Sequence, residues 1–188
     1  ALRDADPARL TVVLPYLAYA RKERRTKDLD PVSTRYLAQL LEAIGVDRVV
    51  AMDVHNPAAV ENAFRVPFVH LEARPLLAAG LPAVAAGIER VVVSPDAGGY
   101  KRAERFRELL ASAGTEPPGM AFLEKKRSEG VLSGQTLVGA VAGCHAVIVD
   151  DLISTGATLA RAARACSEAG ASGVSRDRRG WRRSGGVG

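Results

Sequence analysis

Short β-branched runs alternate along the chain with longer segments in which apolar residues recur at helical spacing. The runs predict strands at residues 11–14, 48–52, 90–93, 120–123 and 144–149. Helical periodicity covers residues 31–44, 75–87, 101–113 and 158–168, and in the first of these the apolar positions are Leu37, Leu40, Leu41 and Ile44. This alternation predicts an α/β fold with parallel strands and flanking helices.

Polar clusters follow most of the predicted strands. They occupy residues 53–55, 94–99, 124–130 and 150–158, and a further charged stretch without apolar periodicity at 21–30 is expected to be an exposed loop. Ligands bind beyond the carboxyl ends of strands in open α/β sheets. We therefore expect the functional residues of this chain in these clusters.

Composition narrows the class of protein. Hydrophobic residues make up 47% of the 188 positions, enough for a buried core, and no apolar run approaches the roughly 18 residues that span a bilayer. Residues 171–188 hold five Arg and one Asp and supply +4 of the net charge of +5, so the remaining residues are nearly neutral and do not indicate nucleic-acid binding. Two widely separated cysteines, Cys144 and Cys166, favour a reduced, cytoplasmic protein.

The strongest chemical signal lies at residues 147–158. An apolar strand leads into Asp150 and Asp151, and a loop of small and hydroxyl residues then opens a helix. The carboxylates can accept hydrogen bonds from vicinal sugar hydroxyls, while the loop and the helix N-terminus suit a phosphate. The candidate ligands for a ribose 5-phosphate are Asp150, Asp151, Ser154, Thr155, Gly156, Ala157 and Thr158. The alternative is that the aspartates merely end a strand and Ser154 caps a helix.

This run resembles the phosphoribosyl-pyrophosphate signature of phosphoribosyltransferases and ribose-phosphate pyrophosphokinases. Four further blocks, at 15–25, 53–55, 94–99 and 124–127, are similar to the pyrophosphokinase family and follow its order. The resemblance implies two pseudo-repeated, phosphoribosyltransferase-like halves of which the first is incomplete. Residues 1–78 would then be the later part of the first half, and residues 79–170 most of the second.

The resemblance also implies a reaction, in which ATP gives its diphosphoryl group to ribose 5-phosphate with the help of Mg²⁺. By family position, ATP would contact Arg21, Lys22 and His55, and the metal would be held by Asp53, His55 and Asp96. Lys125 and Arg127 would be catalytic, beside a polar segment at 128–130 that suits a closing lid. For Lys22 and for residues 124–130, a solvated run of charge is the alternative.

Several features depart from the family pattern. Ala157 stands where a second glycine is common and fits only if its φ is negative, and Ser154 replaces a common aspartate but keeps an oxygen for capping. No starting Met and no upstream nucleotide segment are present, and we expect no strand after Gly170. Residues 171–188 would be either non-native or a genuine disordered basic tail. A chain incomplete at both ends is expected to be nearly inactive alone.

Two other functions remain open at this stage. One is a non-catalytic relative that regulates an active synthetase, and the other is a phosphoribosyltransferase with a base-binding site. The retained Lys125, Arg127 and Asp96 argue against the first, while Arg21 and the Asp53–His55 pair argue against the second. The family resemblance further implies a homo-oligomer in the intact protein, with neither nucleic acid nor membrane as a partner.

Overall fold

The structure is a computed structural model that describes residues 2–111, 116–128 and 131–176. The chain divides into two units, unit 1 at residues 1–73 and unit 2 at residues 74–188. This division lies five residues before the predicted one, which followed residue 78. Among the described residues, every helix is too short or too polar to pass through a bilayer.

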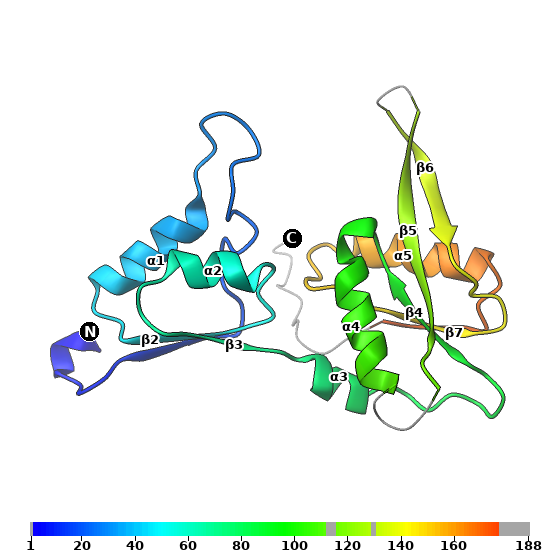
Figure 1. Cartoon of the computed structure of the whole chain (residues 1–188), viewed down its shortest axis with the longest axis horizontal. Helices are drawn as coiled ribbons and strands as arrows, with labels where there is room; N and C mark the ends of the chain where they lie inside the picture. Colours follow the sequence, from blue (N-terminus) through cyan, green and yellow to red (C-terminus); the bar gives the residue numbers. More distant parts are fainter. Residues whose placement is uncertain (1, 112–115, 129–130, 177–188) are drawn as a thin grey trace, which may run out of the picture. The chain divides into compact units, whose positions relative to one another are not determined.

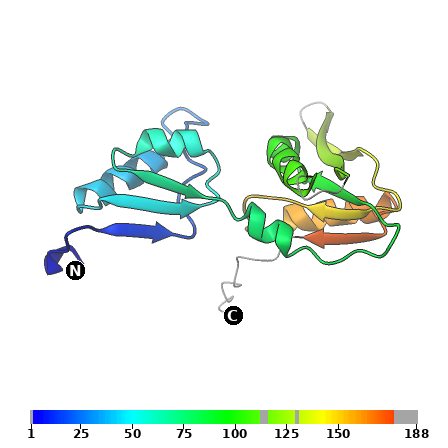
Figure 2. The ribbon, with the colours of Figure 1, turned by 60° about the horizontal axis from the view of Figure 1, so that its bottom comes forward.

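Unit 1 is a three-stranded parallel sheet with helices on one face. Its elements are a 3₁₀ turn at Arg3–Ala5, β1 (Thr11–Leu14), α1 (Ser33–Ala43), β2 (Arg48–Met52), α2 (Pro57–Ala63) and β3 (Phe68–Leu71). The strand order is β1-β2-β3. Because both crossovers step in the same direction across the sheet, α1 and α2 lie on the same side of it (Figure 2). The strands predicted at 11–14 and 48–52 are confirmed, whereas α2 and β3 were not predicted.

The core of unit 1 lies between that sheet face and the two helices. Val49 and Ala51 of β2 alternate into it and pack with Ala38 of α1 and Val60 of α2. The predicted stripe on α1 is only partly correct, since Leu40 and Ile44 are exposed while Leu37 and Leu41 pack against the core. Only the side of α1 that carries Leu37 and Leu41 therefore faces the core.

Unit 2 contains a mixed five-stranded sheet (Figure 1). Its elements are α3 (Arg74–Ala79), β4 (Arg90–Ser94), a 3₁₀ turn at Ala97–Gly99, α4 (Tyr100–Ala111), β5 (Gly119–Ser128), β6 (Val131–Val138), β7 (His145–Ile148), α5 (Ala157–Glu168) and β8 (Gly173–Arg176). The strand order is β6-β5-β4-β7-β8, and all pairs are parallel except the antiparallel pair β5–β6.

The two helical crossovers of unit 2 step in opposite directions from the centre of the sheet. The crossover from β4 to β5 moves one way and that from β7 to β8 the other, which places α4 and α5 on opposite faces. Buried residues alternate accordingly, with Val91 of β4 packed in the α5 cluster and its neighbour Val92 in the α4 cluster. The segments that follow β4 and β7 therefore diverge. Such a switch point leaves a crevice at the carboxyl ends of the two strands.

Two elements in the middle of the chain differ in length from their predictions. The helix predicted at 75–87 ends at Ala79, because Gly80 and Pro82 do not continue a helix. The strand predicted at 120–123 is longer in the structure, because β5 continues through the charged segment to Ser128, where β6 pairs with it and satisfies its backbone groups. Residues 129 and 130 of the predicted lid lie outside the described residues.

The expectation that no strand follows Gly170 is wrong. Gly173–Arg176 forms β8 and pairs in parallel with β7. Ser175 Oγ lies 2.7 Å from His145 Nε2, and a Cβ at Gly173 would lie only 2.7 Å from His145 Nδ1. A small residue and a hydroxyl thus fit beside the imidazole, which lets a short, weakly apolar segment complete the sheet. Residues 177–188 of the predicted tail lie outside the described residues.

Candidate functional site

The loop between β7 and α5 carries the residues predicted to read a sugar phosphate. Gly156 adopts φ +78°, a left-handed conformation that glycine reaches at little cost, and the next residue, Ala157, begins α5. Ala157 is absent from the positive-φ residues among those described, so the condition set for it from sequence is met. The N-cap residue of α5 is Gly156, which makes no side-chain hydrogen bond to the helix. Ser154 therefore does not act as a cap, whereas Thr155 Oγ1 accepts a hydrogen bond from the Ala157 backbone N–H at 3.3 Å.

Asp150 and Asp151 lie at the start of this loop, directly beyond the carboxyl end of β7. The Asp151 backbone N–H donates to Asp150 Oδ1 at 2.8 Å. Burial of the carboxyl group, together with the neighbouring Asp151, raises the pKa of Asp150 from 3.8 to about 6. The chain has thus placed two adjacent carboxyl groups where ionisation of both is costly, which is a mark of functional sites.

A tight turn follows β4, the hydrogen-bonded neighbour of β7. Asp96 Oδ1 accepts from the Gly99 backbone N–H at 2.9 Å, and the buried Ser94 Oγ donates to the Asp96 carbonyl at 2.6 Å. A Cβ at Gly99 would lie 2.6 Å from Ser94 Oγ. Glycine is therefore required there by packing. Gly98, the other glycine of the predicted cluster, is exposed on the same turn.

Arg102 joins the two loops and was not among the predicted residues. It lies in the first turn of α4, and its Nη1 and Nη2 reach Asp150 Oδ1 at 3.3 Å and Asp151 Oδ2 at 3.0 Å. The available sequence signal was a basic residue three positions after Gly99, on the helix that follows β4. Nothing in the sequence alone indicated that this helix faces the acidic pair, because the order of the strands was unknown.

The predicted nucleotide loop lies beyond the carboxyl end of β1 in unit 1. Arg21 and Lys22 are both exposed. The loop is anchored to the start of α1 by the buried Thr34, whose Oγ1 donates to the Tyr19 carbonyl at 2.7 Å and whose backbone N–H donates to the Lys22 carbonyl at 3.4 Å. The two basic side chains are therefore held on an ordered loop with their charges in solvent.

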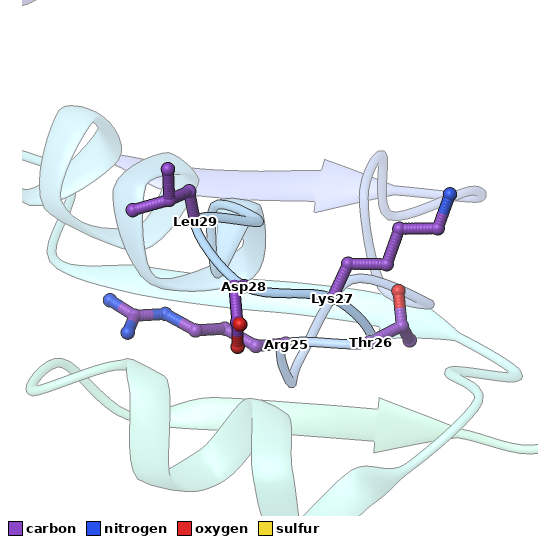
Figure 3. A pocket seen from close by; sticks show the side chains of 5 residues that line it. All are labelled: Arg25, Thr26, Lys27, Asp28 and Leu29. Atoms are coloured by element: carbon purple, nitrogen blue, oxygen red, sulfur yellow. The ribbon is translucent and has the colours of Figure 1, made fainter.

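A shallow hollow of about 440 Å³ lies further along the same loop (Figure 3). It is lined by Arg25, Thr26, Lys27, Asp28 and Leu29. Asp30 closes the loop, since its Oδ2 accepts from Thr26 Oγ1 at 2.6 Å, and this hydrogen bond lowers the pKa of Asp30. The mixed charges around the hollow make it a poor pocket for an anion. The predicted ATP contacts Arg21 and Lys22 are not among the residues that line it.

Asp53 and His55 follow β2, the neighbour of β1. Asp53 has φ +47°, and its Oδ1 accepts from the Ala73 backbone N–H at 3.2 Å. His55 is exposed. His70 on β3, which was not predicted, accepts from the Val54 backbone N–H through Nε2 at 3.2 Å. The role of His70 is thus to hold the turn that presents Asp53 and His55.

The candidate metal ligands Asp53, His55 and Asp96 lie on the turns described above. Within the described ranges, no three His, Cys, Asp or Glu side chains gather closely enough to hold a metal ion by themselves. Asp53 belongs to unit 1 and Asp96 to unit 2. Each carboxylate accepts one backbone N–H and retains capacity for further contacts. Taken separately in its own unit, each carboxylate fits Mg²⁺, which binds as few as one protein carboxylate and completes its shell with water and substrate phosphates.

Lys125 and Arg127 lie on β5, and their backbones pair with Gln135 and Leu132 of β6 across a register shift. The side chains of both residues lie outside what the structure describes. Their positions along the hairpin are therefore known, whereas their predicted catalytic role stays a prediction.

Comparison with known proteins identifies both parts of the chain. Residues 1–45 match the family described as the N-terminal domain of ribose phosphate pyrophosphokinase. Residues 77–175 match the phosphoribosyl transferase domain, with the loop after β7 inside the match. The chain belongs to the ribose-phosphate pyrophosphokinase family. The predicted α/β fold of phosphoribosyltransferase type, with parallel sheets and flanking helices, is thereby confirmed.

Individual relatives agree with this assignment. The chain is 37% identical over 172 residues to a ribose-phosphate pyrophosphokinase of Prochlorococcus marinus, covering 91% of this chain and 50% of the relative. A second, from Caldanaerobacter subterraneus, is 38% identical over 172 residues, covering 91% and 52%. The crystal structure of phosphoribosylpyrophosphate synthetase from Mycobacterium smegmatis aligns with a TM-score of 0.81 at 34% identity, covering 93% of this chain and 55% of that one. The chain thus spans about half the length of the relatives that it matches.

Proposed function

We propose that this chain carries the active-site elements of a ribose-phosphate diphosphokinase, which makes phosphoribosyl pyrophosphate and AMP for nucleotide biosynthesis. The observation that carries the proposal is the loop at the switch point of unit 2. There two partly buried carboxylates, Asp150 and Asp151, begin a loop that ends at the left-handed Gly156, the N-cap of α5. The family membership supplies the reaction class.

The sugar would be read by the two ends of this loop. Asp150 and Asp151 would accept hydrogen bonds from the two vicinal hydroxyls of ribose 5-phosphate. The 5-phosphate would take the backbone N–H groups at the start of α5, where the helix dipole favours an anion, together with the hydroxyls of Ser154, Thr155 and Thr158. This assignment uses every feature of the loop, including the requirement for glycine at position 156.

The reaction transfers a diphosphoryl group. The anomeric oxygen of ribose 5-phosphate forms a bond to the β-phosphorus of ATP, its proton is lost to solvent, and the bond from that phosphorus to the oxygen shared with the α-phosphate breaks. AMP leaves with that oxygen. Lys125 and Arg127 are proposed to stabilise the charge that develops on the transferred group.

The nucleotide is proposed to bind through unit 1. Arg21 can pair its guanidinium with phosphate oxygens or stack it on adenine, with Lys22 and His55 as neighbouring contacts. The candidate Mg²⁺ ligands are Asp53 and His55 in unit 1 and, separately, Asp96 in unit 2, and bound Mg²⁺ would neutralise charge on the polyphosphate. The family resemblance also supports a homo-oligomer and a cytoplasmic location, which remain parts of this proposal.

The test combines a reaction assay with a binding assay on the 188-residue chain and on a chimera. The chimera joins the chain to the residues of the Prochlorococcus marinus relative that the match leaves uncovered. AMP formation from ATP that requires both ribose 5-phosphate and Mg²⁺, and that Lys125→Ala in the chimera abolishes, supports the proposal. Ribose 5-phosphate binding without AMP formation by the chimera favours the regulatory alternative. Release of pyrophosphate from phosphoribosyl pyrophosphate on adding a base favours a phosphoribosyltransferase.

A further inference from the structure

Arg102 binds both members of the acidic pair with one planar group. Its Nη1 lies 3.3 Å from Asp150 Oδ1 and its Nη2 lies 3.0 Å from Asp151 Oδ2. All three side chains are largely buried, at 25%, 17% and 11% exposure. A guanidinium holds its nitrogens at a fixed separation, which the ammonium of a lysine does not provide. The arginine therefore fixes the distance between two carboxylates that would otherwise repel each other.

The approach of Arg102 to the pair depends on the turn after β4. A Cβ at Gly99 would lie 3.4 Å from Arg102 Nη1 and 2.6 Å from Ser94 Oγ. The same turn is held by the hydrogen bonds of Asp96 with Gly99 and with Ser94. Since β4 and β7 are hydrogen-bonded neighbours, this ordered turn directs the first turn of α4 toward the loop after β7.

The charges around Asp150 oppose one another. Burial and the neighbouring Asp151 raise the pKa of Asp150 to about 6, while Arg102 acts to lower it. If the arginine were removed, one carboxyl group would hold its proton to a higher pH. A protonated carboxyl group offers fewer acceptor sites to a sugar hydroxyl than a carboxylate does.

We propose that Arg102 is a positioning residue of the sugar site, which clamps Asp150 and Asp151 at a fixed spacing and in their ionised forms so that both accept hydrogen bonds from vicinal hydroxyls. The identity of the sugar as ribose 5-phosphate rests on the proposed function. The clamp itself rests on the contacts of Arg102 alone. It assigns a task to a residue outside the loop that carries the signature.

The first experiment follows the side-chain carboxyl signal of Asp150 by ¹³C NMR as a function of pH, in the ligand-free chain. Arg102→Gln should move the Asp150 titration midpoint upward, and Arg102→Lys should move it less, because the charge stays while the two-nitrogen contact is lost. Arg105→Gln is the matched control, since Arg105 is an exposed arginine one turn along the same helix and should leave the midpoint in place. An unmoved midpoint in both Arg102 variants overturns the proposal. If Arg102→Gln does not fold, Arg102→Lys decides.

The second experiment measures ribose 5-phosphate affinity by calorimetry across the same pH range. Arg102→Gln should weaken binding by about tenfold or more near neutral pH, the scale of one charge-assisted hydrogen bond, and should shift the pH profile upward. The ligand phosphate itself titrates near pH 6, roughly as other phosphate monoesters do, so the readout is the difference between profiles. An equal loss at every pH indicates mere structural support and overturns the positioning role. Absence of binding by the unmodified chain refutes the proposed function instead.

Discussion

The two units order their strands differently, and only unit 2 has helices on both faces of its sheet. In unit 1 the strands follow sequence order, both helices cover one face, and the other face leaves Val13 at 64% exposure and Leu71 at 44%. In unit 2 the order reverses at β4 and β7, helices cover both faces, and Val92 and Val147 are buried as deeply as Val91. Arg102 meets the acidic pair beside these two strands, where the order reverses.

This difference shows that chain order decides both stability and the position of a site. A one-sided sheet buries each strand on alternate residues only, whereas a two-sided sheet buries consecutive residues of its central strands. The diverging crossovers that produce the two-sided core also produce the binding edge. In unit 2 the same topological feature therefore supports the fold and the candidate chemistry.

The largest expected effect is on the unfolding free energy, which should respond differently to substitutions in unit 2 and in unit 1. Phe106→Ala removes a nearly fully buried ring from the α4 face of unit 2 and should cost about 3–5 kcal/mol of unfolding free energy. Leu40→Ala, on the exposed side of α1 in unit 1, should change it by less than about 0.5 kcal/mol. Native-state hydrogen exchange, measured by segment, checks each unit separately. Similar losses in the two variants would contradict the one-sided description of unit 1.

The next largest effect concerns ribose 5-phosphate binding, which we expect to depend on unit 2 and not on unit 1. Asp150→Asn should weaken ribose 5-phosphate binding by about tenfold to a hundredfold, because it removes a charged acceptor worth about 1.5–3 kcal/mol. Asp53→Asn in unit 1 should leave that affinity unchanged. Calorimetry on both variants makes the comparison. Equal weakening by both substitutions would mean that the sugar site is not confined to unit 2.

The edge strand β8 is expected to depend on one glycine. Gly173→Ala places a Cβ 2.7 Å from His145 Nδ1 and should cost about 1–3 kcal/mol as an overpacked contact. Gly119→Ala on β5 is the matched control, since its Cβ would meet Val91 at an ordinary 3.5 Å. Faster hydrogen exchange in β7 and β8 for the first variant, and not for the second, confirms the pairing. Equal tolerance would show that β8 is not held as described.

The acidic pair should give unit 2 a distinctive dependence on pH. Asp150 titrates at about 6 in the folded chain against 3.8 otherwise, so the folded state binds more protons between these values. Its contribution to stability is complete below 3.8 and is lost as the pH rises through about 6. The melting temperature of the unmodified chain should therefore gain more than that of Asp150→Asn when the pH falls from about 7.5 to about 5.

Comparing the unmodified chain with Asp150→Asn removes the contributions of other titratable groups to the pH dependence of stability. Burial lowers the pKa of His145, and this group acts in the opposite direction, since its contribution is present above 6.5 and is lost as the pH falls through its lowered pKa. That contribution is common to the unmodified chain and to Asp150→Asn. Identical pH profiles for the two would contradict the assignment to Asp150.

The smallest effect concerns the uncovered sheet face. Val13→Thr in unit 1 should change the unfolding free energy by less than about 0.5 kcal/mol, because the new hydroxyl stays in solvent. Val92→Thr makes the same change on a fully buried strand of unit 2 and should cost about 1–3 kcal/mol through burial of a hydroxyl. Unfolding in urea, followed by hydrogen exchange in each unit, measures both. A large loss for Val13→Thr would show that this face is covered.

The sequence by itself determined those elements whose pattern is local, that is, formed by residues close together in the chain. The strands at 11–14 and 48–52, the helix ending at Glu168 and the acidic loop at 150–158 follow from side-chain periodicity and from the turn chemistry of Gly156. The family membership likewise follows from the order of its motifs. These features depend on neighbouring residues, and local physics is enough to read them.

Features that depend on contacts between distant segments of the chain were decided only by the tertiary structure. The charged part of β5 became a strand because β6 satisfied its backbone, and β8 formed because Gly173 and Ser175 fit beside His145. Arg102 reached Asp150 and Asp151 because β4 and β7 are neighbours whose helices diverge. Arg102 and Asp150, for example, lie 48 residues apart in the sequence. These contacts form only when the strands take this order in the sheet, and no local sequence pattern encodes that order.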